Sequence, residues 1–117
     1  MTSRSDLTVR DLVRGMQIEI RDTDLLPDRA AHLLTMLTAL LGNVNDEIRE
    51  ADAAYAGVLL QCLEGEEAAN RAKIRAEISP EYQRKREARD TKELVIELVR
   101  SLKYFLKAQA EEMRLSR

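Results

Sequence analysis

The sequence contains very few of the residues that build β-sheets, disulfide frameworks and metal sites. Its 117 residues include no Trp, three Tyr, one Phe, one Cys, one His and two Pro. Strands favour β-branched and aromatic side chains, so a sheet protein is not expected. One Cys cannot form an intrachain disulfide, and one Cys with one His cannot assemble the usual zinc frameworks. We expect Cys62 to be a buried small hydrophobic residue.

Long apolar runs and catalytic motifs are also missing. No stretch approaches the roughly 20 apolar residues that cross a bilayer. The first ten residues, MTSRSDLTVR, lack the apolar core of a signal peptide. There is no Gly-rich phosphate loop, nucleophile elbow or paired-histidine motif. We therefore expect a soluble, cytoplasmic, non-catalytic protein without a metal or cofactor and without membrane contact.

Charged residues and helix formers dominate what remains. Charged residues make up 34% of the chain, and Ala, Leu, Glu and Arg recur throughout. This composition is typical of long helices and coiled coils. The length suits one domain, residues 1–117, but helices as long as those proposed below would make it elongated. The expected fold class is all-α, either a long antiparallel helical hairpin or a bundle with coiled-coil character.

The longest regular pattern begins after Pro27. Apolar and small residues follow one another in alternating steps of four and three, which is the spacing of a coiled-coil or bundle seam. These residues are Ala30, Leu34, Leu37, Leu41, Val44, Ile48, Ala51, Tyr55, Val58 and Cys62. The phase continues to Ala76 and predicts one helix over 27–78, about 78 Å long. A break near Gly65 is the alternative, because Gly weakens a helix interior.

Two further helices flank this one. An apolar stripe predicts a short helix over 8–21, which Thr8 or Ser5 could cap. Ser79 and Pro80 end the long helix, and Ser79 can cap a helix over 80–115. Apolar residues of that last helix cover more than one narrow stripe, so it needs several neighbours. We therefore expect a homo-oligomer whose interface uses Leu34, Leu37, Leu41, Val95, Leu98, Leu102 and Phe105.

Charge is distributed unevenly along the chain. The net charge is -2, yet 19–67 holds eleven acids against three bases, and 68–92 holds eight bases against four acids. If the chain reverses at Ser79 and Pro80, the basic runs on both sides of the turn meet at one tip. Such a cluster suits a phosphate backbone, and Tyr82 could stack on an unpaired base. Interleaved acids leave open a salt-bridged helix surface or an acidic protein partner instead.

The order of these features resembles that of small helical phage recombination mediators of the UvsY type. A long amphipathic helix leads into Lys73-Ile74-Arg75, a Tyr-x-x-Lys stretch follows from Tyr82 to Lys85, and an apolar helix comes last, over about 34–106 in all. The resemblance implies a ring-like oligomer assembled through its C-terminal helices, with Lys73 and Arg75 on single-stranded DNA. The short connection at Ser79 and the helix at 8–21 depart from this pattern.

The sequence thus predicts an oligomeric accessory protein that binds single-stranded nucleic acid, with a recombinase or another phage replication protein as a partner. The predicted contact residues are Arg71, Lys73, Arg75, Tyr82, Arg84, Lys85 and Arg89. The alternative is a structural or scaffolding coiled-coil protein that binds only protein.

Overall fold

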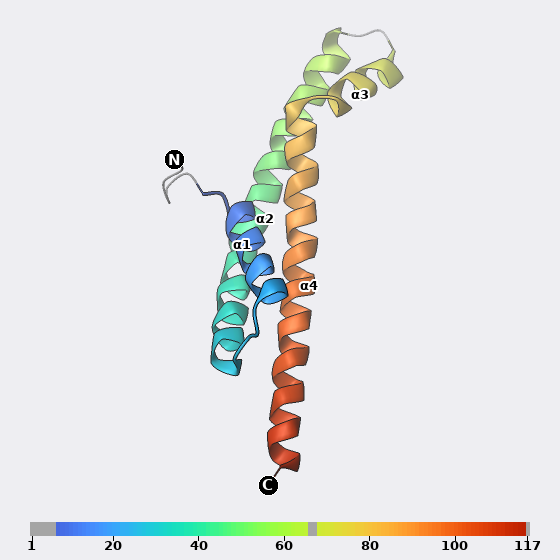
Figure 1. Ribbon diagram of the computed structural model, residues 1–117. Coiled ribbons are helices and arrows are strands. Elements are labelled where there is room, and N and C mark those ends of the chain that lie inside the picture. The colour runs from blue at the N-terminus through green and yellow to red at the C-terminus, as the bar shows by residue number, and fades with distance from the viewer. Residues whose placement is uncertain (1–6, 66–67, 117) are drawn as a thin grey trace.

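The computed structural model describes residues 7–65 and 68–116, and all regular structure within them is helical. The helices are α1 (Val9–Asp22), α2 (Pro27–Gly65), α3 (Ala69–Glu77) and α4 (Pro80–Leu115) (Figure 1). No strand occurs among the described residues. The predicted all-α fold is therefore confirmed.

Side-chain caps fix where two of the helices begin. The Thr8 hydroxyl accepts a bond from the Asp11 N–H, and the Asp11 carboxylate accepts one from the Thr8 N–H, both at 3.1 Å. The alternative cap, Ser5, lies outside the described residues. At α4 the Ser79 hydroxyl accepts from the Tyr82 N–H at 3.2 Å and donates to the Ala76 carbonyl at 2.6 Å. Each cap satisfies amides that a helix start leaves unpaired.

The expected continuous helix over 27–78 is wrong, because α2 ends at Gly65 and a separate helix, α3, begins at Ala69. Gly65 lacks the side chain that restrains a helical backbone, and Glu64 brings negative charge to the unfavourable C-terminal end of the helix dipole. A reversal at Ser79 and Pro80 was considered as a condition in the sequence analysis, and the structure places the reversal before α3 instead. Figure 1 shows that α3 folds back from the end of α2 and that α4 then continues antiparallel to α2.

Three helices share the main core. α2 and α4 pack against each other along most of their common length, and α1 lies across both (Figure 1). Leu and Val side chains from all three helices fill the space between them. The buried cluster consists of Val13, Ala30, Leu33, Leu37, Val44, Val95, Leu98 and Leu102. This cluster is called the three-helix core below.

The seam residues expected at an oligomer interface lie instead inside the single chain. Leu37, Val95, Leu98 and Leu102 are 0–8% exposed in the three-helix core. Leu34, Leu41 and Phe105 are partly buried against it. The sequence pattern specified an apolar stripe, and the chain's own helices cover that stripe. Packing within one chain is therefore enough to bury Leu37, Val95, Leu98 and Leu102.

The molecule is a rod. Its principal extents are 73, 34 and 22 Å, and its radius of gyration is 19.6 Å, against about 13 Å for a compact domain of this length. The C-terminal end of α4 projects beyond the start of α2 (Figure 1). Within the described residues, no helix combines the length and apolarity needed to span a bilayer.

Candidate nucleic-acid interface

Two alanines fix the orientation of α3. Ala72 and Ala76 are four residues apart, both are completely buried, and they place one face of the nine-residue helix against α2. A methyl side chain lets two helices approach closely. The larger basic side chains, Arg71, Lys73 and Arg75, are therefore left on the exposed surface. These three predicted contact residues are brought together on one short helix.

Two other predicted contacts, Arg84 and Arg89, form ion pairs between α4 and α2. Arg84 donates to the Glu47 carboxylate and lies 3.5 Å from Glu50, and Arg89 donates to Asp52 at 2.9 Å. Each pair joins α4 to α2. The hydrogen bond to Glu47 raises the pKa of the Arg84 guanidinium further above its ordinary value. The acidic first half of the sequence and its basic middle therefore neutralise each other here.

Tyr82 and Lys85 belong to a small cluster around Tyr55. The rings of Tyr55 and Tyr82 are 5.3 Å apart at an angle of 47°, and the Lys85 ammonium lies 4.5 Å from the Tyr55 ring centre. Such ring and cation–π contacts stabilise the joint between helices. Burial, and next the charge of Glu77, raise the pKa of the Tyr55 hydroxyl. Tyr82 is half-buried in this cluster.

The sequence analysis predicted Tyr55 only as one of the seam residues of the long helix and did not predict its contact with Tyr82 and Lys85. Its position gave a signal, because it is the only aromatic residue in α2. Tyr82 likewise stands near the start of α4. In an antiparallel pair of helices, the end of one helix meets the start of the other. The pairing of the two tyrosines could therefore have been found once the reversal was placed correctly.

The exposed side of α3 is basic and apolar. Among the described residues, no acidic side chain pairs with Arg71 or Lys73, while Arg75 does make an interaction. Glu77 is the single acid within the helix. Ile74 is 62% exposed and Ile78, directly after the helix, is 80% exposed. This combination, called the α3 surface below, is defined by Arg71, Lys73, Ile74, Arg75 and Ile78.

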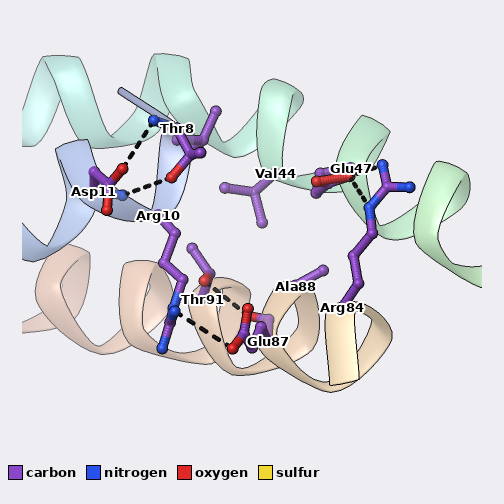
Figure 2. A pocket seen from close by; sticks show the side chains of 10 residues that line it. Thr8, Arg10, Asp11, Val44, Glu47, Arg84, Glu87, Ala88 and Thr91 are labelled. Carbon is purple, nitrogen blue, oxygen red and sulfur yellow. Dashed lines mark hydrogen bonds and ion pairs between the residues drawn. The ribbon is translucent and has the colours of Figure 1, made fainter. Parts of the chain in front are cut away.

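A cavity of about 390 Å³ lies elsewhere, between the start of α1 and the α2–α4 pair. Figure 2 shows Arg10 of α1 directed at Glu87 of α4, with 3.5 Å between charged atoms, and Arg84 directed at Glu47. Val9, Val44 and Ala88 supply apolar lining. Each arginine at this cavity faces a carboxylate, so the charges offer little attraction to a charged ligand. The cavity therefore marks the place where the start of α1 packs against α2 and α4.

The single histidine and the single cysteine, which are common metal ligands, differ in their exposure to solvent. His32 is exposed on α2, and Cys62 is half-buried rather than fully buried as the sequence led us to expect. Within residues 7–65 and 68–116, no group of three or more His, Cys, Asp or Glu side chains could hold a metal ion. The α3 surface is therefore the candidate nucleic-acid interface.

Comparison with known proteins adds no relative: no family model, curated protein or solved structure matches the chain.

Proposed function

We propose that this protein is a non-catalytic accessory protein that binds single-stranded nucleic acid through the phosphate contacts of α3. The observation that carries the proposal is the exposure of Arg71 and Lys73 on one short helix without an acidic partner among the described residues. A phosphate backbone gains affinity when such bases displace its counterions. Arg75 adds a third base to the same helix.

The ion pairs narrow the set of contact residues. Arg84 and Arg89 would have to leave their carboxylates on α2 before they could reach a phosphate. Lys85 would have to leave the face of Tyr55. These exchanges reduce the gain from each contact. The proposed primary phosphate ligands are therefore Arg71 and Lys73. Arg75 of the same helix, which makes another interaction, and Lys85, Arg84 and Arg89 of the adjoining α4 are secondary contacts.

Oligomerisation is part of the proposal. Three bases on one copy give modest affinity, and several copies on one strand raise it through effective concentration. The projecting end of α4 supports association, since it carries Tyr104, Met113 and Leu115 with 65–77% of their surface exposed. A role as a phage recombination mediator, with a recombinase as partner, is the most specific form of this proposal.

A salt titration against a labelled oligothymidine strand tests the nucleic-acid proposal. We expect log affinity to fall linearly with log salt, with a slope of about 0.7 for each phosphate neutralised. Arg71→Glu with Lys73→Glu should abolish binding at moderate salt. The matched control is Arg49→Glu with Arg100→Glu, which changes the net charge equally at two exposed positions outside α3. Equal loss in both variants, or no binding of the unaltered protein at low salt, contradicts the proposal.

A protein-only scaffold is the second candidate function. The same exposed side chains at the end of α4 favour it, because exposed apolar patches mark protein contacts. Its distinguishing result is association without nucleic acid binding. Light scattering on the unaltered protein, and on a Met113→Gln and Leu115→Gln variant, measures this association. A scaffold predicts that the variant dissociates and that no strand binds at any salt concentration.

A further inference from the structure

Helix α3 buries its small alanines, whereas the larger isoleucines of the α3 surface are exposed. Ala72 and Ala76 have no exposed surface, whereas Ile74 and Ile78 are 62% and 80% exposed. Two residues correspond to about 200° of rotation around a helix, so Ile74 lies opposite Ala72. Burying an isoleucine side chain stabilises a protein, because apolar surface is removed from water. Folding of the single chain leaves that stabilisation unused at both isoleucines.

Basic side chains flank this exposed apolar pair. Arg71 precedes Ile74 by three residues and therefore lies beside it along the helix. Lys73 is the preceding residue and lies about 100° away from Ile74 around the helix, on the other side from Arg71. Arg71 and Lys73 are both exposed and have no acidic partner among the described residues. A ligand that is complementary to the α3 surface must combine apolar faces with closely spaced negative charge.

A single nucleic-acid strand has this combination of properties. Its bases present apolar faces when they are unstacked, and a phosphate accompanies each base. A duplex presents the same phosphates but hides the base faces in its stack. The apolar pair on α3 therefore distinguishes the two forms, whereas Arg71 and Lys73 alone do not.

We propose that Ile74 and Ile78 pack against unstacked bases while Arg71 and Lys73 contact the adjoining phosphates, so that α3 selects single strands over duplexes. This inference rests on the proposed function, because it names the part of the same site that reads the strandedness of the ligand. The isoleucines supply the selectivity for single strands. Arg71 and Lys73 supply phosphate affinity, which single strands and duplexes share.

The test uses one double variant that carries both Ile74→Gln and Ile78→Gln. Its affinities are compared with those of the unaltered protein. Glutamine keeps helix propensity and removes the apolar surface. We expect affinity for an oligothymidine strand to fall about tenfold, in line with the loss of base packing. Affinity for a duplex of equal length and the salt slope for the single strand should stay unchanged, since the phosphate contacts remain. Leu60→Gln, at a residue of α2 that is 57% exposed, is the control for loss of apolar surface elsewhere.

The other outcomes distinguish failure of the isoleucine inference from failure of the proposed function. If the glutamine variant binds the single strand undiminished while Arg71→Glu with Lys73→Glu does not, the isoleucine inference is overturned and the proposed function stands. If no strand binds at low salt, both fail. If vesicles of anionic lipid bind through the isoleucines and the single strand does not, the α3 surface is a membrane contact and the inference is overturned.

Discussion

The two halves of the rod are packed in different ways. The three-helix core joins α1, α2 and α4 through Leu and Val side chains that are almost completely buried. The other half, called the α3 end, comprises α2 from Ala51 onward, α3, and α4 up to Ala88. Its buried residues are small apart from one tyrosine: Ala51, Tyr55, Ala72, Ala76 and Ala88. Less apolar area is removed from water there, so the α3 end contributes less to stability.

This difference agrees with the proposed separation of stability from binding. Large apolar side chains face inward in the three-helix core, but at the α3 end two isoleucines face outward next to bases. A surface reserved for a ligand cannot also be used to pack the chain. We infer that the three-helix core maintains the fold and that the α3 end presents the binding surface. The contrast between the two halves can be broken or sharpened by four measurements, with the largest expected effect in the core.

Truncation of a core leucine should separate the two halves most clearly. Leu37→Ala and Leu102→Ala, at residues with 0% and 1% exposure, should each destabilise the protein by about 2–5 kcal/mol. Ile74→Ala should change stability by less than about 0.5 kcal/mol, because its side chain is exposed. Urea unfolding followed by circular dichroism measures all three. Similar losses at Leu37 and Ile74 would show that the halves are equally packed.

Hydrogen exchange should show that α3 opens more readily than the centres of α2 and α4. A nine-residue helix is too short to be stable alone, and α3 is anchored mainly through two alanines. We expect amides of α3 to exchange at least about a hundred times faster than those around Leu37 and Leu98. Mass spectrometry of exchanged peptides measures the rates. Equal protection in α3 would refute the weaker anchoring.

Replacement of helical glycines should stabilise both halves alike. Gly42 and Gly57 lie within α2, neither has a positive φ, and an added Cβ would meet no atom within 4 Å at either position. Each Gly→Ala change should therefore gain about 1 kcal/mol of helix propensity. Thermal unfolding of the two variants gives the comparison. A gain at Gly42 alone would mean that the α3 end is already open when the core unfolds.

The smallest effect concerns pH and belongs to the three-helix half. Arg29 donates to Glu19 at 2.6 and 2.7 Å, which links α2 to α1 and holds the pKa of Glu19 below its ordinary value of 4.5. A lowered folded-state pKa stabilises the protein above the ordinary value, and this contribution is lost as pH falls through the folded-state pKa. Stability should therefore decline as pH falls below 4.5. In urea unfolding, Glu19→Gln should show a shallower decline, and an unchanged decline would assign it to other carboxylates.

Individual residues show how far the sequence could predict this structure. The capping role of Ser79 and the start of the last helix at Pro80 were predicted correctly, because caps depend on residues adjacent in sequence. The break at Gly65 was given only as the alternative to a continuous helix, since the seam phase continues through it. Arg84 and Arg89 were assigned to a ligand, but their carboxylate partners on α2 are 34–37 residues away in sequence. Contacts at that distance depend on where the chain reverses.

The sequence by itself determined the all-α class, the apolar seam of α2 and the basic composition of the region around α3. These properties arise from local spacing and propensity, which act within a few turns of helix. Only the tertiary structure decided what covers the seam. A heptad stripe specifies an apolar face but not whether the covering helix belongs to the same chain or another. Here α4 of the same chain covers it, and the position of the reversal leaves Arg71 and Lys73 exposed while Arg84 and Arg89 are paired.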